Sequence, residues 1–277
     1  MNYRHSFHAG NFADLVKHAL VLWLLKTRQK AGPVTVFDTH AGAGLYDLSG
    51  DGARSREAEA GVAKLMTAEG RTPLMDALAA EVEKLNPDGG VRFYPGSPLL
   101  IADALSEGGR YVGFELNPPV REMLAEALTG RANAQAREGD GYEAVTAEAA
   151  RVRGPLVLID PPYEVQDAEY PQILATVREI LTRMPQAQIA VWYPIKQRRS
   201  LQQFFRKASH LPAKSVLLAE FMVRPDDSPL RLNGSGMLLV NAPWQFDQVI
   251  APALPVLKKH LGEAGASTRL EWLKASE

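Results

Sequence analysis

The segment Asp160-Pro161-Pro162-Tyr163 has the residue types that most directly suggest chemistry. Its prolines have fixed φ angles and no N–H donors, so the nearby carbonyls can face a bound group rigidly. An exocyclic amine would donate its two N–H groups to the Asp160 carboxylate and the Pro161 carbonyl, leaving the nitrogen lone pair to attack a methyl donor. Tyr163 offers a flat face for stacking a base. The motif therefore predicts methyl transfer to a conjugated amine, with Asp160 stabilising the charge that develops on nitrogen.

Four residues cannot distinguish this catalytic motif from a strand that is followed by an ordinary Pro-Pro turn. The motifs upstream are therefore needed to decide between the two interpretations. The turn Asp38-Thr39-His40-Ala41-Gly42-Ala43-Gly44 contains glycines that let the backbone pass close to a ligand, although G-x-G alone is a weak signal. A nicotinamide site would need a third glycine that opens a helix, and the sequence instead continues Leu-Tyr-Asp-Leu-Ser over 45–49. S-adenosylmethionine has no pyrophosphate, so this turn favours it as the cofactor.

Two acids follow later apolar segments in an order that suits an adenosine site. Glu115 ends the segment 111–115, where a carboxylate can accept hydrogen bonds from both ribose hydroxyls. Asp140 lies where a third strand should end and could accept a hydrogen bond from the adenine amino group of the cofactor. Each acid alone is more often a helix cap or a surface residue. The order glycine turn, acid, acid, Asp-Pro-Pro-Tyr is what predicts S-adenosylmethionine binding.

The elements that must position these motifs follow from hydrophobic spacing. A helix is expected over 11–30, and strands are expected at 34–38, 111–115, 156–160, 189–193, 216–223 and 237–241. Helical patterns between several strands predict an α/β fold with a mainly parallel sheet, with the last two strands as an antiparallel hairpin at its edge. Ser97-Pro98 predicts a helix N-cap followed by proline at the first helical position.

Residues 51–92 interrupt the strand pattern with a stretch rich in Ala, Glu and Leu. They predict a small helical insertion within a single domain that spans 1–277. The insertion could shape a substrate entrance or could simply add packing, and both hypotheses stay open.

Composition narrows the class of protein. The 277 residues are 46% hydrophobic, which is enough for a sizeable core. There is no cysteine and the histidines show no ligand spacing, so neither a disulfide nor a metal site is expected. No segment reaches the ~20 apolar residues that span a bilayer, and the first residues do not resemble a signal peptide. A cytoplasmic protein without membrane partners is therefore expected.

The formal net charge of -1 argues against general polyanion binding as the main activity. However, the stretch between Ile180 and Ala219 contains no Asp or Glu and is rich in Lys and Arg. A local basic face is therefore expected there, and the part near Arg198 and Arg199 is the hypothesis for a contact with an RNA backbone.

Beyond these separate motifs, the sequence resembles the RlmJ family of 23S ribosomal RNA adenine-N6 methyltransferases over nearly its whole length. The stretches that carry the resemblance are Tyr3-Arg4-His5-Ser6-Phe7-His8-Ala9-Gly10-Asn11, 38–44, Tyr94-Pro95-Gly96-Ser97-Pro98, 160–163 and Trp192-Tyr193-Pro194. The resemblance implies a class I S-adenosylmethionine-dependent methyltransferase fold with a helical insertion. It also implies methylation of one adenine of 23S RNA, on naked or incompletely assembled RNA.

The resemblance further implies roles for individual residues. The cofactor contacts that it implies are His18, His40, Ser97, Glu115, Asp140 and Gly141, with Lys17 as a neighbouring candidate. Gly42 joins this set from the glycine turn. Asp160 would act on the adenine amino group and Tyr3 would touch the RNA. Arg4 and His5 flank that tyrosine with cations that can pair with single-stranded RNA.

Three other functions stay open at this point. The nearest is a DNA adenine-N6 or cytosine-N4 amino methyltransferase, because Asp-Pro-Pro-Tyr chemistry serves any conjugated amine. A binding protein that kept the fold but lost turnover would bind the cofactor without transferring methyl. A nicotinamide oxidoreductase would bind NAD. The protein is expected to act as a monomer on 23S ribosomal RNA.

Overall fold

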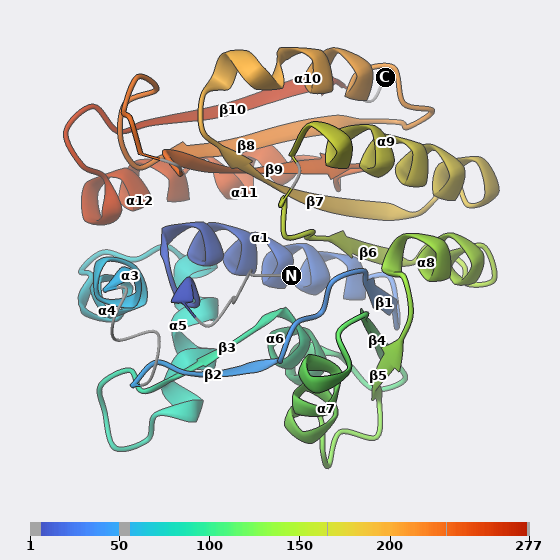
Figure 1. The fold of residues 1–277 in the computed structure, drawn as a ribbon, viewed down its shortest axis with the longest axis horizontal. Coiled ribbons are helices and arrows are strands. Elements are labelled where there is room, and N and C mark those ends of the chain that lie inside the picture. Colours follow the sequence, from blue (N-terminus) through green and yellow to red (C-terminus); the bar gives the residue numbers. More distant parts are fainter. Residues whose placement is uncertain (1–6, 50–55, 165, 231, 276–277) are drawn as a thin grey trace.

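The computed structural model describes residues 7–49, 56–164, 166–230 and 232–275. Within them, the strands form one eight-stranded sheet and one two-stranded sheet. The strands of the large sheet are β1 (Thr35–Asp38), β4 (Arg110–Glu115), β5 (Ala134–Glu138), β6 (Leu156–Ile159), β7 (Gln188–Ile195), β8 (Val216–Met222), β9 (Gly234–Val240) and β10 (Ser267–Lys274). Their order across the sheet is β10-β8-β9-β7-β6-β1-β4-β5 (Figure 1).

The sheet has a parallel part and an antiparallel part. From β5 through β4, β1 and β6 to β7, every pair is parallel. β9 is antiparallel to both β7 and β8, and β10 is antiparallel to β8. The predicted mainly parallel sheet with an antiparallel edge is therefore confirmed. β10 was not predicted, because Arg269, Glu271 and Lys274 break its apolar pattern on this half-exposed edge strand.

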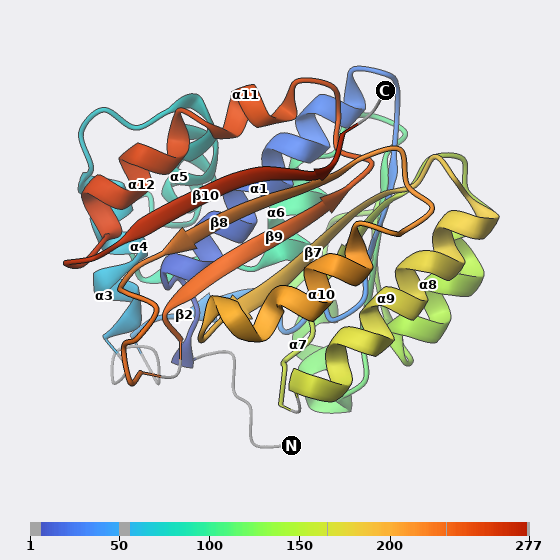
Figure 2. The ribbon, with the colours of Figure 1, turned by 90° about the horizontal axis from the view of Figure 1, so that it is seen from above.

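Helices cover both faces of the large sheet (Figures 1 and 2). On one face, α1 (Phe12–Gln29), α6 (Ser97–Ala104), α7 (Pro118–Ala127), α11 (Phe246–Ile250) and α12 (Ala253–Leu261) pack into one core cluster. On the other face, α8 (Gly141–Ala149), α9 (Gln166–Arg183) and α10 (Gln202–Ala208) pack into a second cluster, and η2 (Arg198–Leu201) leads into α10. No helix in the described ranges has the length and apolar content to cross a membrane.

The strand that precedes the Asp-Pro-Pro-Tyr motif lies in the middle of this arrangement. Leu156 and Leu158 of β6 belong to the core on the α1 face, while Val157 and Ile159 belong to the core on the α9 face. A strand that is buried on both faces needs a continuous apolar run, and the sequence Leu-Val-Leu-Ile supplies one. The next residue, Asp160, therefore leaves the sheet at its carboxyl edge.

In the described part of the stretch after the glycine turn, the helices are α3 (Glu57–Ala60), α4 (Val62–Thr67) and α5 (Pro73–Leu85). The short strands β2 (Leu45–Asp47) and β3 (Phe93–Pro95), which were not predicted, pair antiparallel and join the two ends of this stretch. The backbone N–H of Val62 donates to the carbonyl of Gly10 at 2.8 Å. A Cβ on Gly61 would lie 2.2 Å from that carbonyl oxygen, so this close approach requires glycine.

Candidate active site

The carboxyl edge of the large sheet brings the predicted motifs together. β1 and β6 are parallel neighbours, so the glycine turn after β1 and the Asp-Pro-Pro-Tyr motif after β6 emerge side by side. The backbone N–H of Thr39 donates to the carbonyl of Leu158 at 3.0 Å, which extends the ladder to the start of both motifs. β4 lies on the other side of β1 and carries Glu115 to the same edge.

Asp160 is held by a lysine from α1. The Nζ atom of Lys17 lies 2.6 Å from Oδ2 of Asp160 and 2.9 Å from Oδ1 of Asp14. The Lys17 side chain is 5% exposed, and that of Asp160 is 14% exposed. Burial lowers the pKa of Lys17, but the two carboxylates outweigh it and hold that pKa above its ordinary value, so the ammonium stays charged. Within the described residues, Oδ1 of Asp160 accepts no hydrogen bond and can receive one from a substrate.

This triad of Asp14, Lys17 and Asp160 was not predicted. Lys17 was predicted only as a neighbour of the cofactor, and Asp14 was not singled out. Asp14 lies in the first turn of α1, where its Oδ2 accepts the backbone N–H of Gly10 at 3.0 Å. The i, i+3 spacing of Asp14 and Lys17 could have suggested an ion pair between them. That spacing does not indicate the third member of the triad, Asp160, which follows β6.

Tyr163 has an unusual backbone conformation for a bulky residue, with φ at 51° in the left-handed region. Its hydroxyl donates to the carbonyl of Trp192 at 2.5 Å, and its ring lies edge-on to the Trp192 ring at 5.5 Å. A second ring, that of Tyr170, lies 5.6 Å away. These contacts fix the tyrosine beside Asp160. Trp192 also lies 5.7 Å from the Lys17 ammonium, so it belongs to the same cluster.

The glycine turn is tied to Glu115. Gly42 has φ at +66°, and its backbone N–H donates to Oε2 of Glu115 at 3.1 Å. Oε1 of the same carboxylate accepts the backbone N–H of Asn117 at 2.9 Å. Each oxygen keeps a second lone pair, so the pinned carboxylate can still accept ribose hydroxyls. A Cβ on Gly42 would lie 2.6 Å from the Tyr46 hydroxyl, which leaves no room for a side chain there.

Ser97 has a different place from the one predicted. The N-cap of α6 is Gly96, and the serine is the first helical residue. Its hydroxyl donates instead to Oδ2 of the buried Asp38 at 2.8 Å, where Tyr111 also donates at 3.2 Å. The N-cap prediction is therefore wrong, because a buried carboxylate competes for the hydroxyl. Burial raises the pKa of Asp38 to about 6, with the Ser97 hydrogen bond acting in the opposite direction.

Asp140 and Gly141 form the start of α8, next to the glycine turn. Oδ1 of Asp140 caps the helix by accepting the backbone N–H groups of Tyr142 and Glu143 at 2.9 and 3.2 Å. A Cβ on Gly141 would lie 1.9 Å from the carbonyl oxygen of Thr39, so glycine allows the helix to touch the turn. Asp140 therefore caps a helix, which was the alternative role for this acid. Its second carboxylate oxygen remains available to accept a hydrogen bond from a ligand.

The two predicted histidines differ in their surroundings. His40 lies in the glycine turn with its ring 5.0 Å from that of Tyr142, and burial lowers its pKa to about 4, so it is neutral near pH 7. His18 is 1% exposed, stacks on Tyr94 and shares a 2.8 Å hydrogen bond with the Tyr94 hydroxyl. The predicted RNA contacts Tyr3, Arg4 and His5 lie outside the described residues.

Comparison with known proteins identifies the family. The model of the family described as ribosomal RNA large subunit methyltransferase D, RlmJ, matches residues 31–274. This chain belongs to the RlmJ family.

Relatives agree with this assignment along the whole chain. It is 31% identical over 277 residues to the ribosomal RNA large subunit methyltransferase J of Escherichia coli, covering 99% of each chain. It is 32% identical over 281 residues to the protein of the same name from Haemophilus influenzae, again covering 99% of each. The crystal structure of protein LPL1258 from Legionella pneumophila superposes with a TM-score of 0.84 at 25% identity, covering 95% of this chain and 98% of that one.

As an RlmJ family member, the protein is a methyltransferase and S-adenosylmethionine is its methyl donor. The residues at the carboxyl edge fit that group. The backbone N–H of Gly42 fixes the Glu115 carboxylate beside the glycine turn, and Asp140 presents a second carboxylate at the start of α8. These groups are the acceptors that the ribose hydroxyls and the adenine amino group of the cofactor require.

Proposed function

We propose that the protein methylates the N6 amino group of one adenine in 23S ribosomal RNA, on protein-free or incompletely assembled RNA. The observation that carries this proposal is the Asp160 carboxylate, with Oδ2 held by Lys17 and Oδ1 open beside the glycine turn. The names of the Escherichia coli and Haemophilus influenzae relatives support ribosomal RNA of the large subunit as the substrate and do not favour DNA.

In the proposed mechanism, the chain positions the amine and accommodates its charge. Oδ1 of Asp160 and the carbonyl of Pro161 accept the two N–H groups of the adenine amine, which aims its lone pair away from them. S-adenosylmethionine supplies the electrophilic methyl group when it is bound. Positive charge develops on the amine nitrogen as the new N–C bond forms, and the nearby carboxylate of Asp160 stabilises it. Asp160 then accepts the departing proton or passes it to water.

Lys17 has a positioning role in this proposal. Its ammonium occupies one oxygen of Asp160, so the carboxylate can turn only its other oxygen to the amine. The charge of Lys17 is balanced by Asp14, which keeps the triad near a net charge of -1. Tyr163 and Trp192, locked together by their hydrogen bond, provide the aromatic surface beside the target base.

The proposed cofactor contacts are Gly42, Glu115, Asp140, Gly141 and His40, which lie on the turns after β1, β4 and β5. We also keep Ser97 and His18 as proposed cofactor contacts, the serine held by its hydrogen bond to Asp38 and the histidine by its hydrogen bond with Tyr94. Lys17 stays a candidate for a cofactor contact through its place next to Asp160.

We also propose that 1–277 is a single methyltransferase domain and that its insertion, predicted at about 51–92, shapes the RNA entrance. Glu57 of α3 supports this role because its carboxylate bonds His8 at 3.0 Å and Asn11 at 2.9 Å. The insertion thereby holds the chain just after Tyr3, Arg4 and His5, which we propose touch the RNA. We expect the protein to work in the cytoplasm as a monomer, which light scattering with and without RNA would test.

Product analysis tests the proposed substrate. Labelled methyl transfer is measured on protein-free 23S RNA, on intact large subunits and on DNA, followed by nucleoside separation. We expect N6-methyladenosine from the free RNA alone. Label in DNA, or in another nucleoside of the RNA, would contradict the proposal.

A further inference from the structure

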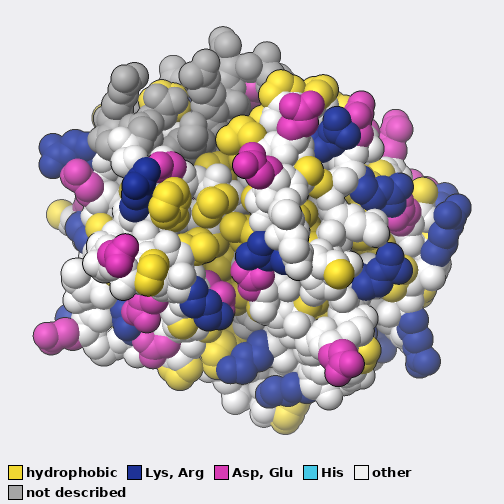
Figure 3. Space-filling model, turned by 90° about the horizontal axis from the view of Figure 1, so that it is seen from below, with side chains coloured by type: hydrophobic (Ala, Val, Ile, Leu, Met, Phe, Trp, Pro, Cys, Tyr) yellow, Lys and Arg dark blue, Asp and Glu magenta, His cyan; other side chains and the backbone are white. Residues whose placement is uncertain are grey.

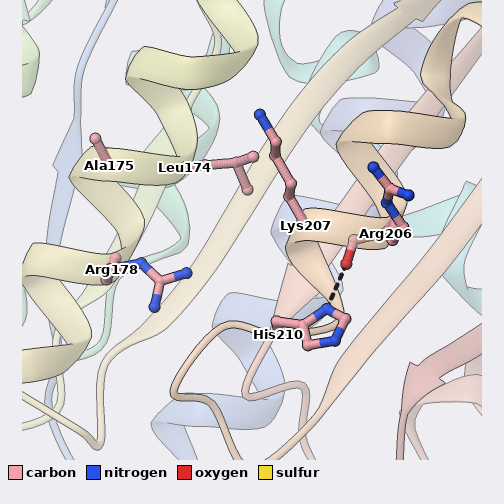
Figure 4. Close-up of a pocket in the computed structure, with 6 residues that line it drawn as sticks. All are labelled: Leu174, Ala175, Arg178, Arg206, Lys207 and His210. Atoms are coloured by element: carbon pink, nitrogen blue, oxygen red, sulfur yellow. Dashed lines mark hydrogen bonds between the residues drawn. The ribbon is translucent and has the colours of Figure 1, made fainter.

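α9 and α10 lie on the sheet face opposite α1 (Figure 2). Side chains of α9, of α10 and of the turn that follows α10 line a basic groove. Its volume is about 270 Å³. The residues that line it are Leu174, Ala175 and Arg178 from α9 and Arg206, Lys207 and His210 from the end of α10 and the following turn (Figure 4). Apart from Leu174, every one of these side chains is exposed, so the groove opens to solvent.

The cations of this groove have no acidic partners. Within the described residues, no ion pair or hydrogen bond involves the side chains of Arg178, Arg206 or Lys207. α10 contains no acid, and the nearby acid of α9, Glu179, is paired with Arg183 at 2.6 Å. A cluster of exposed cations without counter-charges repels itself unless an anion binds to it.

Some cations elsewhere on the surface are paired with acids. Arg131 bonds Asp103 through both its Nε and Nη2 atoms, and Arg224 bonds Glu263 in the same way. On the face shown in Figure 3, Lys and Arg side chains lie among Asp and Glu side chains. The groove differs in that three cations without acidic partners among the described residues line one hollow, in a molecule whose net charge is -1.

The structure also moves the expected RNA contact away from Arg198. The Nε atom of Arg198 donates to Oε2 of the buried Glu220 at 3.1 Å, and its Nη1 donates to Ser267 at 3.3 Å. Arg199 bonds Gln197 at 3.0 Å. The basic stretch that the sequence singled out thus uses Arg198 internally, while Arg206 and Lys207 remain available.

We infer that this groove binds backbone phosphates of the RNA substrate at a distance from the target adenine, an inference that rests on the proposed function. Guanidinium groups bind phosphate through paired N–H donors, and a lysine adds a point charge. The ring of His210 is held at the end of α10 by its Nδ1 hydrogen bond to the carbonyl of Arg206 at 2.7 Å (Figure 4). The three cations suit consecutive phosphates.

The groove lies at a definite distance from the catalytic edge. α9 begins at Gln166, shortly after the Asp-Pro-Pro-Tyr motif, and Arg178 follows twelve residues later. At 1.5 Å per residue, the backbone of Arg178 lies about 18 Å along the helix from its start. A bound RNA must therefore run along α9 to reach both places, so the groove selects substrates that extend well beyond the target nucleotide.

Titration of RNA binding tests this inference. The triple variant R178A/R206A/K207A is compared with wild type and with R153A/K258A/K259A, which removes the same charge from other exposed positions. We expect the groove variant alone to bind a 23S RNA transcript more weakly, and its log Kd against log salt slope to fall by about 2 to 3, since each phosphate contact contributes about 0.7–0.9. Its kcat at saturating RNA should be retained while its KM rises.

A short RNA supplies the second comparison. An oligonucleotide that contains the target adenine but is too short to span about 18 Å should bind wild type and the groove variant equally. Unchanged affinity and slope in the groove variant, an equal loss in the control variant, or an equal loss with the short RNA would each overturn the inference. If the inference is overturned but the wild-type protein transfers methyl to RNA, the proposed function still stands. If the wild-type protein transfers no methyl to RNA, the proposed function and the inference about the groove are both wrong.

Discussion

The Nζ atom of Lys17 lies 2.6 Å from Oδ2 of Asp160, although 143 residues separate them in the sequence. The pair connects the first helix of the chain to the strand end that carries the Asp-Pro-Pro-Tyr motif. It fixes the orientation of the carboxylate before any ligand binds. Removing one member of such a buried pair leaves the other charge uncompensated. This loss commonly destabilises the folded state more than replacing both members with apolar residues does.

The first prediction concerns this lysine. We expect Lys17→Met to lower kcat by at least about 100-fold, because Asp160 loses its orientation and faces Asp14 without a cation between them. It should also lower the free energy of unfolding by about 3–5 kcal/mol. Single-turnover methyl transfer and chemical denaturation measure the two effects. Lys26→Met, at an exposed position of the same helix, is the control; equal behaviour of the two variants would contradict the prediction.

The second prediction is an opposite pH dependence at two neighbouring residues. Burial raises the pKa of Asp38 to about 6, so between its unfolded value near 4 and pH 6 the folded state binds more protons and stability falls as pH rises. Burial lowers the pKa of His40 to about 4, so between pH 4 and about 6.5 the unfolded state binds more protons and stability increases with pH.

Denaturant titrations at several pH values between 4 and 6.5 test this pair of signs. Asp38→Asn should make stability rise more steeply with pH than in wild type. His40→Gln should make it rise less steeply or fall. Parallel stability curves for wild type and both variants would show that neither group is shifted as described.

The third prediction concerns the contact of α8 with the glycine turn. We expect Gly141→Ala to cost about 1–3 kcal/mol of stability, because its Cβ would lie 1.9 Å from the Thr39 carbonyl oxygen and push the helix away. The affinity for S-adenosylmethionine should fall too, since Asp140 moves with that helix start. Thermal unfolding and calorimetric titration measure both effects. Glu143→Ala, an exposed change in the same turn, should leave both near wild type.

The fourth prediction links the insertion to RNA. The hydrogen bond that His8 makes to the Glu57 carboxylate raises the pKa of His8, with burial opposing it. The stability that this pair adds is therefore present below pH 6.5 and is lost as pH rises through the raised pKa. We expect Glu57→Gln to raise the KM for RNA severalfold without changing S-adenosylmethionine affinity, and to destabilise the protein at pH 6 more than at pH 9.

The matched control for that prediction is Glu59→Gln, because Glu59 lies on the same short helix and pairs only with the exposed Arg56 among the described residues. The same rise of KM in both variants would show that loss of surface charge, and not the hydrogen bond to His8, is responsible.

Local patterns predicted the central part of the fold because their causes are local. The β6 run Leu-Val-Leu-Ile is buried on both faces and ends at the motif, as its apolar content indicated. The prediction that Ser97 is a helix N-cap was wrong, because capping preferences do not account for a buried carboxylate nearby. β2 and β3 were missed because each has only three residues and depends on a partner strand that is distant in the sequence, as in the pair Tyr46 and Tyr94, which are 48 residues apart.

Long-range pairing explains what the sequence could not show in the site. The acceptors after the strands were expected at one edge because parallel strands end together, and the structure brings Asp160, Glu115 and Asp140 to that edge. The contact of Lys17 with Asp160 depends on how α1 packs across the sheet, which no local spacing encodes. The unpaired cations between α9 and α10 likewise depend on the packing of two helices.

The most direct test of the central claim is to measure methyl transfer and ligand binding together in Asp160→Ala. We expect methyl transfer to protein-free 23S RNA to fall by at least about 1000-fold, while S-adenosylmethionine and RNA still bind with affinities near wild type. Asp227→Ala, which removes an exposed acid elsewhere, should retain full activity. If Asp160→Ala methylates the RNA at the wild-type rate, this carboxylate does not act on the amine and the proposed mechanism is wrong.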